Sequence, residues 1–369
     1  MSDREVSPFD IEMMQKCLQL AGRAAGKTSP NPLVGSVIVK DGKIIGEGFH
    51  PGIGQPHAEV FALKDAGEAA GATVYVNLEP CNHYGRTPPC TSALIAARVA
   101  KVVAGMVDPD PRVAGGGIKK LQEAGIEVVV GVEETACRQL NEAFIHRILH
   151  QQTFGILKYA MTLDGKIAAT TGHSAWVTGE ASRHLVHRVR SSCDAVVVGG
   201  NTVRKDNPNL TTHGVTKHNP LRVVMSRSLD LPRDCNLWDT NIAPTTIFTE
   251  DKDSTLQKIL ISKGVEIVSV DTLTPKVVSD RLYKLGKSQI LWECGGTLAA
   301  KAIADGTIQK VMAFIAPKII GGTSAPSPVG DLNLTMMTDA LALQEVRIKA
   351  IASDILVEGY LATNYEQLT

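Results

Sequence analysis

The sequence predicts a two-domain protein of the α/β class. Its 369 residues are too many for one ordinary hydrophobic core. Segments with helical apolar spacing alternate with short apolar runs in both halves, which is typical of helices packed on sheets. The apolar fraction of 44% and the charged fraction of 21% are typical of a soluble globular protein. We expect a first domain over residues 1–150 and a second over residues 151–369.

Apolar spacing and turn residues define the elements of the first half. Ile11, Met14 and Leu18 recur at helical intervals and predict a first helix that ends near Gly26. Asp41-Gly42 is typical of a tight turn between two hairpin strands. In order, we expect a helix over 11–21, strands over 34–39 and 43–48, a helix over 58–70, a strand over 73–78, a helix from 90, a strand over 102–106, a helix over 118–124, a strand over 127–130 and one helix over 134–149.

The second half alternates in the same way, and it contains no internal repeat or low-complexity tract. We expect strands over 155–160, 195–198, 221–225, 245–249, 265–268, 289–292 and 311–315, followed by β-rich segments near Leu343 and Ile355.

The charge balance limits the class of partner. Thirty-eight basic and thirty-eight acidic residues cancel, so the chain lacks the basic surplus of a nucleic-acid-binding protein. A small phosphorylated ligand held by one or two arginines is compatible with this balance. The N-terminal residues form no apolar signal segment, and no run reaches the length of a membrane span. We expect no nucleic-acid or membrane partner; among protein partners, we expect a second copy of the chain in a homo-oligomer.

The cysteines favour a reducing compartment. Seven is an odd number, spread over a long chain, and does not form the pattern of a disulfide framework. We therefore expect the cytoplasm, where a close cysteine pair favours metal binding.

Three short clusters carry the chemistry of the first half: His57-Ala58-Glu59, Pro80-Cys81 and Pro88-Pro89-Cys90. One imidazole and two thiolates suit zinc, and three protein ligands leave a fourth position for water. Zinc-bound water ionises near neutral pH and becomes a usable nucleophile. Glu59 is too close to His57 along the chain for both to bind one ion easily, so we expect it to transfer a proton. This arrangement is typical of zinc deaminases.

Two alternatives give the clusters a purely structural role. A closed zinc site would need a fourth protein ligand, and His83 is the obvious one. Such a site has no use for Glu59, which favours the catalytic interpretation. The second alternative is that the cysteines are simply buried as apolar residues. This does not suit the proline-flanked pair, but it suits the other five: Cys17, Cys137, Cys193, Cys235 and Cys294.

The clusters, together with the strings PNPLVG at 30–35, GRTPPC at 85–90 and DPDP at 108–111, resemble one family. It is the bifunctional riboflavin-biosynthesis deaminase/reductase, and the resemblance spans nearly the whole chain. It implies a cytidine-deaminase-like three-layer α/β domain followed by a dihydrofolate-reductase-like α/β domain. The first domain would deaminate a diaminopyrimidine that carries a ribosylamino 5′-phosphate, and the second would reduce the ribosyl group to ribityl with NADPH.

The resemblance also implies roles for residues of the first half. His57, Cys81 and Cys90 would hold one zinc ion, Glu59 would be the proton shuttle and Asn31 would contact the substrate ring. His83 and Arg86, in the loop between the cysteines, are further candidates for substrate contacts. The segment from 108 to 117 would border the substrate, although its prolines and glycines suit a turn-rich connector equally well.

Several strings of the second half match the family's reductase domain in order. The chain has no G-x-G-x-x-G fingerprint, but KYAMTLDG at 158–165 resembles K-x-A-x-S-x-D-G with threonine at 162. A Gly-Gly pair after the strand near Trp292 would let a pyrophosphate approach a helix N-terminus. The cofactor residues implied are Ala160, Trp176, Thr202, Asp206, Gly295, Gly296 and Thr297; the substrate residues implied are Lys158, Ser174, Arg190, Leu210 and Glu293.

Two positions depart from the family pattern. His213 stands where the family usually has an arginine near the substrate phosphate, and histidine is only partly charged at neutral pH. Lys217 or Arg204 would be substitutes. Ser226-Arg227 stands where the family tends to have Asp-Ser, and Arg227 suits the 2′-phosphate of NADPH.

The other helical histidines are interpreted as surface residues rather than metal ligands. We expect Glu142, His146 and His150 to form a charged solvated helix face, and His184 and His187 to lie on the surface of a polar helix. No residue of the second half stands out as a general acid or base, so we expect orientation of cofactor and substrate to dominate there.

Two other functions remain as alternatives. A deaminase of nucleic-acid bases would share the zinc motif, but only 4% of the chain is aromatic. A nucleotide sensor with a structural zinc would bind without turnover.

Overall fold

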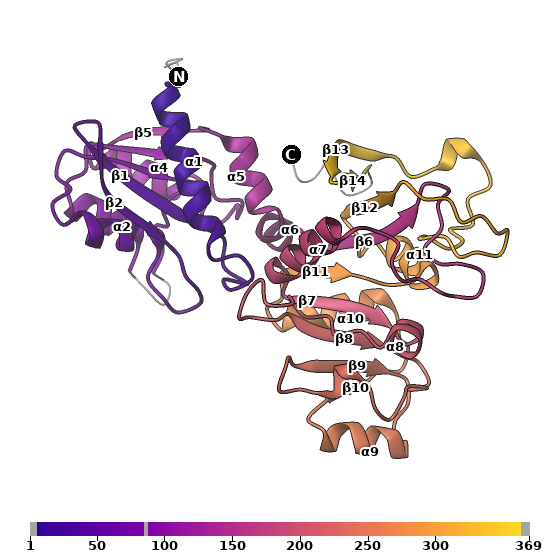
Figure 1. The fold of residues 1–369 in the computed structure, drawn as a ribbon. Helices are drawn as coiled ribbons and strands as arrows, with labels where there is room; N and C mark the ends of the chain where they lie inside the picture. The colour runs from indigo at the N-terminus through magenta and orange to yellow at the C-terminus, as the bar shows by residue number, and fades with distance from the viewer. Residues whose placement is uncertain (1–5, 85–87, 363–369) are drawn as a thin grey trace. The chain divides into compact units, whose positions relative to one another are not determined.

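The helices and strands fall into two units, Met1–Gln151 and Gln152–Thr369, in a computed structural model that describes residues 6–84 and 88–362 (Figure 1). The first unit consists, in chain order, of α1 (Pro8–Gly22), β1 (Gly35–Lys40), β2 (Lys43–Phe49), α2 (Ala58–Ala66), β3 (Thr73–Val76), α3 (Cys90–Ala96), β4 (Lys101–Ala104), α4 (Gly116–Glu123), β5 (Glu127–Val130), α5 (Glu134–Leu140) and α6 (Glu142–His150).

Strand β1 is covered by helices on both of its faces. The sheet order is β2-β1-β3-β4-β5, with β1 antiparallel to both neighbours and β3, β4 and β5 parallel. A Cβ on Gly35 would lie 2.1 Å from the carbonyl oxygen of Cys17 in α1. The next residue, Ser36, pairs with Gly48, which abuts α2. Because successive strand residues point to opposite faces, the sheet is the middle of three layers.

Two glycines in β2 bring α2 close to the sheet. A Cβ on Gly46 would lie 2.4 Å from the carbonyl oxygen of Ala62, and one on Gly48 would lie 2.4 Å from that of Ala58. No larger residue fits at this separation unless the helix moves. The glycines therefore determine where the N-terminal end of α2 lies.

The helix expected over 134–149 is two helices, because Asn141 interrupts it. The Asn141 side chain accepts from the N–H of Leu33 at 2.8 Å and donates to the carbonyl oxygen of Leu33 at 3.0 Å. The prediction of a solvated face was also wrong for His146, which is 3% exposed. Burial, with a contribution from the adjacent His150, lowers the pKa of His146 to about 3. An apolar stripe on α6 buries this histidine with its neighbour Ile145.

The second unit consists of a long alternation of strands and helices. In chain order these are β6 (Phe154–Thr162), α7 (Glu180–Ser192), β7 (Ala195–Gly199), α8 (Gly200–Asp206), β8 (Leu221–Met225), η1 (Asn236–Trp238), β9 (Thr245–Thr249), α9 (Thr255–Ser262), β10 (Glu266–Ser269), α10 (Pro275–Lys284), β11 (Gln289–Trp292), α11 (Gly296–Ala304), β12 (Lys310–Ala316), η2 (Met337–Asp339), β13 (Leu343–Ile351) and β14 (Asp354–Leu361).

The nine-stranded sheet of the second unit changes direction beside β7. Its order is β10-β9-β8-β7-β11-β6-β12-β14-β13, parallel as far as β12 and antiparallel in the last two strands. The chain runs outward from β7 to β10 and then returns to insert β11 between β7 and β6. Crevices outside the carboxyl ends of strands at such a switch point are the usual ligand sites of open α/β sheets.

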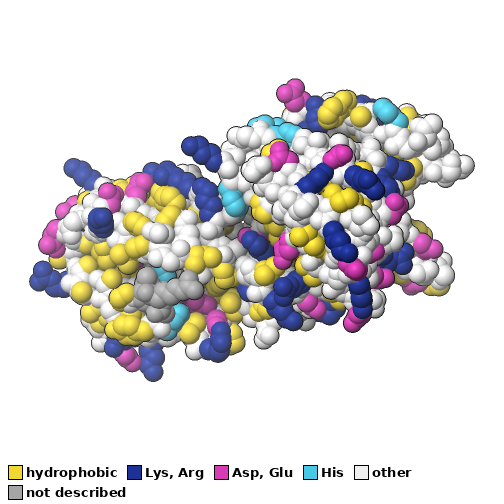
Figure 2. Space-filling view, turned by 90° about the horizontal axis from the view of Figure 1, so that it is seen from below, with side chains coloured by type: hydrophobic (Ala, Val, Ile, Leu, Met, Phe, Trp, Pro, Cys, Tyr) yellow, Lys and Arg dark blue, Asp and Glu magenta, His cyan; other side chains and the backbone are white. Residues whose placement is uncertain are grey.

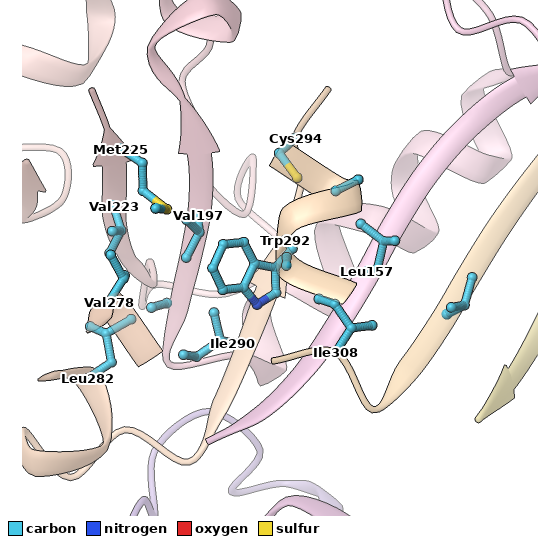
Figure 3. Packing of buried hydrophobic residues seen from close by; sticks show 14 of the residues in the cluster. Leu157, Val197, Val223, Met225, Val278, Leu282, Ile290, Trp292, Cys294 and Ile308 are labelled. Carbon is cyan, nitrogen blue, oxygen red and sulfur yellow. The ribbon is translucent and has the colours of Figure 1, made fainter. Parts of the chain in front are cut away.

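The surface of the second unit is mixed in charge and its core is apolar. On the face that Figure 2 shows, Lys and Arg side chains are interspersed with Asp and Glu. In the core, the fully buried Trp292 of β11 lies among Val197, Ile290 and Ile308 (Figure 3). This packing holds the carboxyl end of β11 in a fixed position beneath the residues that follow it.

Most of the expected strands are present with shifts of one or two residues. Four of them coincide with the expected bounds: Glu127–Val130, Leu221–Met225, Thr245–Thr249 and Gln289–Trp292. Among the described residues, no helix has the length and apolar character needed to cross a bilayer.

Candidate metal centre and cofactor cleft

Three segments of the first unit bring the candidate zinc ligands together. His57 precedes α2 as its N-cap residue, Cys81 follows β3, and Cys90 is the first residue of α3. His57 Nδ1 lies 3.2 Å from Cys90 Sγ and 3.4 Å from Cys81 Sγ. All three ligand atoms lie within 4.8 Å of one another. Bonds of about 2.0–2.3 Å to one zinc ion require separations of this order.

The electrostatics of this cluster favour a thiolate at Cys81, whereas the hydrogen bond to Cys81 and burial raise the pKa of Cys90. The backbone N–H of Cys90, at the start of α3, donates to Cys81 Sγ at 3.3 Å. Donation from the Cys90 thiol is the largest of several effects that lower the pKa of Cys81 to about 4, and His57 adds to it. In return, the Cys81 sulfur raises the pKa of His57. A negative charge is therefore already stabilised where a cation would bind.

Glu59 lies beside the ligand cluster without joining it. It occupies the first turn of α2 and is 3% exposed. Burial is the main reason that its pKa rises to about 7, and the Cys81 charge contributes. A carboxyl group with this pKa can both accept and donate a proton near neutral pH, as a proton shuttle must.

The structure offers no fourth protein ligand among the described residues that could hold a metal. His83 is exposed and lines the adjoining cavity instead of completing the cluster. The described part of the site therefore has the open coordination of a catalytic centre rather than the closed set of a structural one. The other loop candidate, Arg86, lies outside the described residues.

A cavity of about 530 Å³ opens over the cluster. Asn31 lies at its edge, and its side-chain nitrogen is 3.0 Å from His50 Nε2. His50 Nδ1 is 3.0 Å from the carbonyl oxygen of Pro56, which can only accept, so Nδ1 carries the proton. Burial lowers the pKa of His50, so its ring is neutral and Nε2 accepts from Asn31. The nitrogen of the Asn31 amide therefore faces His50, and the amide oxygen makes no hydrogen bond to that ring.

The segment from 108 to 117 borders this cavity, as the first of its two interpretations requires. Asp108, Asp110, Arg112 and Val113 line the space. Further lining residues went unnoticed in the sequence: His50, Glu79, Phe144 and Ile148. The last two stand four apart on α6, an i, i+4 spacing that could have identified them as one helix face.

The second unit contains a cleft of about 900 Å³ at the switch point of its sheet. Helices α8 and α11 begin there, directly after β7 and β11. The structure brings together thirteen residues that the sequence singled out, all lining this cleft: Lys158, Ala160, Ser174, Trp176, Arg190, Thr202, Asp206, Leu210, Arg227, Glu293, Gly295, Gly296 and Thr297.

The two glycines at the start of α11 serve different purposes. A Cβ on Gly295 would meet nothing within 4 Å, so this residue faces open space in the cleft. A Cβ on Gly296 would lie 2.7 Å from the carbonyl oxygen of Ser327. Gly295 therefore leaves room for a ligand at the helix N-terminus, whereas Gly296 admits the 327–330 segment.

The threonine at 162 keeps the hydrogen bonds that a serine would make. Its hydroxyl donates to Asp164 Oδ1 at 2.6 Å and accepts from the N–H of Lys166 at 3.0 Å. Asp164 in turn accepts from the N–H groups of Ile320 and Gly321. The turn after β6 is thereby tied to the 320–321 segment.

A buried cluster of three charges lies at the base of the cleft. Glu293 accepts from Arg190 Nε at 2.5 Å and from Arg190 Nη2 at 3.0 Å. Lys158 Nζ lies 3.6 Å from the same carboxylate. Burial alone would raise the pKa of Glu293, but the two cations outweigh it and hold that pKa at about 2. Burial also lowers the pKa of Lys158.

Two other predicted residues meet across the mouth of the cleft. The Ser174 hydroxyl lies 3.5 Å from Asp206 Oδ1. Trp176 is 69% exposed, with the Arg183 guanidinium 4.4 Å from its ring centroid. An aromatic face stacked on a cation in this way remains available on its other side for a planar ligand.

His213 is the one predicted reductase residue that does not line the described cleft. It is exposed and stacks on His187, with ring centroids 4.1 Å apart. His187 is half-buried rather than on the surface as expected, whereas His184 is exposed. Of the proposed substitutes, Arg204 lines the cleft and pairs with Asp230 at 3.2 Å. Lys217 is exposed and does not line it.

Around Arg227, the cleft is rich in donors. Ser226, Ser228 and Lys301 line it alongside this arginine. Ser226 was noted in the sequence as part of a departure from the family pattern, whereas Ser228 and Lys301 were not singled out. Hydroxyl and cationic groups on one wall suit a phosphate group.

Comparisons with known proteins agree with this division of sites. Residues 7–106 match the family of the cytidine and deoxycytidylate deaminase zinc-binding region, and residues 153–357 match the RibD C-terminal domain. The riboflavin biosynthesis protein RibD of Synechocystis sp. is 60% identical over 96% of this chain and 97% of its own length. RibD of Aquifex aeolicus is 40% identical over 95% of this chain and 98% of its own.

A solved structure extends the likeness to the fold. The Thermotoga maritima diaminohydroxyphosphoribosylaminopyrimidine deaminase/5-amino-6-(5-phosphoribosylamino)uracil reductase superposes with a TM-score of 0.87 at 36% identity, covering 96% of this chain and 99% of that one. The expected fold class, a deaminase-like α/β domain followed by a reductase α/β domain, is confirmed.

Proposed function

The chain belongs to the RibD family of bifunctional riboflavin-biosynthesis deaminase/reductases, and from this premise we propose which residues carry each reaction. The family combines a zinc-dependent deaminase domain with an NADPH-dependent reductase domain. We assign deamination to residues 1–150 and reduction to residues 151–369. The proposed substrate is 2,5-diamino-6-ribosylamino-4(3H)-pyrimidinone 5′-phosphate, whose deaminated product the second domain reduces.

One observation carries the first half of the proposal: three ligand atoms within 4.8 Å of one another, with a buried carboxyl group beside them. His57, Cys81 and Cys90 hold zinc, which when bound supplies an activated water. Glu59 would hold a proton at its carboxyl group and deliver it to the departing amine. The oriented Asn31 amide contacts the ring, and the 108–113 segment borders the substrate.

The second half rests on the cleft at the switch point of the sheet. NADPH supplies the hydride when bound there. Gly295 and Thr297 at the start of α11, with Thr202 in α8, would hold its pyrophosphate, and Arg227 would hold its 2′-phosphate. The remaining cofactor residues would be Ala160, Trp176 and Asp206. Gly296 lets the backbone of the 327–330 segment pack closely against the start of α11.

Substrate in the second domain meets the buried charges. Lys158, Glu293, Ser174 and Leu210 contact the pyrimidine and its sugar. Arg190 uses three N–H groups on Glu293 and Thr211, which leaves two of its five donors for the phosphate. His213, which is exposed, supports the phosphate only from its stacked position on His187. Orientation of the cofactor against the sugar supplies most of the rate enhancement.

The remaining proposals concern partners and compartment. The proposed partner is a small phosphorylated pyrimidine rather than nucleic acid or membrane. The protein is also proposed to be a homo-oligomer, with the long edge strand β13 as one candidate contact between subunits. The proposed compartment is the cytoplasm. All seven cysteines are free thiols, which suits this choice.

The test uses the full-length protein. Zinc-loaded protein given the diaminopyrimidine should release ammonia, contain about one zinc per chain by mass spectrometry and oxidise NADPH only after deamination. Chelation should stop ammonia release while NADPH oxidation continues on substrate that is already deaminated. Binding of substrate and NADPH without either product would favour a sensor. Ammonia release from an RNA or DNA strand alone would favour a nucleic-acid deaminase.

A further inference from the structure

Glu79 is a buried carboxylate that the proposed chemistry does not use. It follows β3, is 5% exposed and lines the deaminase cavity two residues before Cys81. Its Oε2 accepts from the N–H groups of Asp108 at 3.1 Å and Gly115 at 2.9 Å. Its Oε1 accepts from those of Gly117 at 2.8 Å and Ile118 at 3.1 Å. One side chain therefore holds both ends of the 108–118 segment.

The rest of the segment is bonded to itself. Asp110 accepts at its carboxylate from the N–H of Arg112 and at its carbonyl from those of Val113 and Ala114. The N–H of Asp110 donates to the Asp108 carboxylate, and that of Gly116 donates to the carbonyl of Val113. Pro109 and Pro111 have no N–H. Every backbone donor from 108 to 118 thus has an acceptor, and Glu79 supplies four of these bonds.

The contact is too close to tolerate a shift of the backbone. A Cβ on Gly117 would lie 2.0 Å from the carbonyl oxygen of Pro80 and 3.2 Å from Glu79 Oε1. The segment therefore packs directly on Glu79-Pro80, and Cys81 is the next residue. Any movement of the 108–118 segment relative to the metal ligands has to break these contacts.

The pattern suits a carboxylate with two acceptor oxygens. Each oxygen receives two N–H groups, and only a carboxylate offers two acceptor-only oxygens. A glutamine at this position would accept at one oxygen and direct an NH₂ group at two other donors. Bonds to a charged acceptor are also stronger than those to a neutral amide.

We propose that Glu79 is a positioning residue for deamination, which fixes the substrate-bordering segment 108–113 at a set distance from the zinc ligands. The inference rests on the proposed deaminase function. Glu79 touches neither the metal ligands nor the transferred proton. It acts through Asp108 and Arg112, whose places in the cavity depend on the segment that it holds.

The test is Glu79→Gln in the full-length protein, with Glu123→Gln as the matched control. Glu123 is an exposed residue of α4 whose only described ion pair is with Lys119 at its surface. We expect kcat/KM for ammonia release to fall about 10²-fold in Glu79→Gln, mainly through a higher KM. Zinc content and NADPH oxidation on pre-deaminated substrate should equal those of wild type. Glu123→Gln should match wild type in every assay.

Hydrogen exchange gives a second readout that does not depend on turnover. In wild type the amides of Gly115, Gly117 and Ile118 should exchange slowly, and in Glu79→Gln they should exchange at least tenfold faster. Unchanged KM and unchanged exchange in the variant would overturn the proposal, as would loss of zinc along with activity. Fast exchange of these amides in wild type would overturn it even if the variant failed to fold. Absence of ammonia release from wild type would instead count against the deaminase function itself.

Discussion

Replacing Glu59 with glutamine tests the division of labour between the two domains. The change keeps the size of the side chain in a position that is 3% exposed, and it removes the carboxyl group that would carry the transferred proton. A raised pKa of about 7 means that the site already accommodates a neutral group, so the amide should disturb the fold little. We expect zinc to remain bound.

The loss of rate can be bounded from the surroundings of Glu59. A positioned general acid–base group contributes about 10²- to 10⁴-fold, which corresponds to about 3–5 kcal/mol of barrier. The other described carboxylates at the cavity are engaged: Glu79 accepts four N–H groups, Asp110 pairs with Arg112, and Asp108 accepts the N–H of Asp110. No substitute base is at hand among them, so the loss should lie near the upper end.

The assay follows both reactions in the same preparation. Ammonia release should fall by about 10⁴-fold in Glu59→Gln, while NADPH oxidation on pre-deaminated substrate stays within twofold of wild type. Glu12→Gln, an exposed change on α1, serves as the control and should leave both rates unchanged. If the Glu59 variant lost both activities equally, or kept ammonia release within tenfold of wild type, the assignment of this residue would be refuted.

Three further changes test other parts of the argument. Gly48→Ala should displace α2 from β2, which should lower the free energy of unfolding by about 1–3 kcal/mol and reduce zinc content. Calorimetry and metal analysis measure these two effects. The control, Gly22→Ala, adds a Cβ that meets nothing within 4 Å and should change neither quantity. Arg227→Ala should weaken NADPH binding about tenfold by calorimetric titration with little effect on NADH, and equal losses for both cofactors would exclude a 2′-phosphate contact. Thr162→Val should cost about 1–3 kcal/mol in denaturant unfolding because Asp164 loses its hydroxyl donor, whereas Thr162→Ser should cost under about 0.5 kcal/mol; equal costs would show that the hydroxyl is not what matters.

The sequence predicted what local chemistry determines. Strands such as Leu221–Met225 and Gln289–Trp292 are buried on a parallel sheet and are therefore mainly apolar, which makes them easy to recognise. The zinc clusters were recognisable because metal ligands need particular residue types next to turns and helix starts. The residues implied by the family strings reached a common cleft because the carboxyl ends of parallel strands meet at one edge.

Contacts between distant segments left no comparable pattern. Asn141 looks like an ordinary residue within an amphipathic helix, but its side chain satisfies the backbone of Leu33, 108 residues earlier, and this interrupts the helix. Glu79 looks like a polar residue after a strand, and its four partners lie 29 to 39 residues later. The role of such a side chain depends on the distant backbone groups that it bonds after folding. The periodicity of a single sequence contains no information about those groups.

Two of the differences from the family strings, at Thr162 and at His213, differ in consequence for a physical reason. Thr162 keeps the hydroxyl that a serine would provide, and the structure uses that hydroxyl for two hydrogen bonds, so the added methyl group changes nothing that the turn needs. His213 replaces a permanent cation with a ring that is partly charged at best, and burial lowers its pKa further. It also stacks on His187 instead of lining the cleft. On the proposed assignment, Arg190 would then be the main attraction for a substrate phosphate, through the two of its five N–H donors that Glu293 and Thr211 do not use.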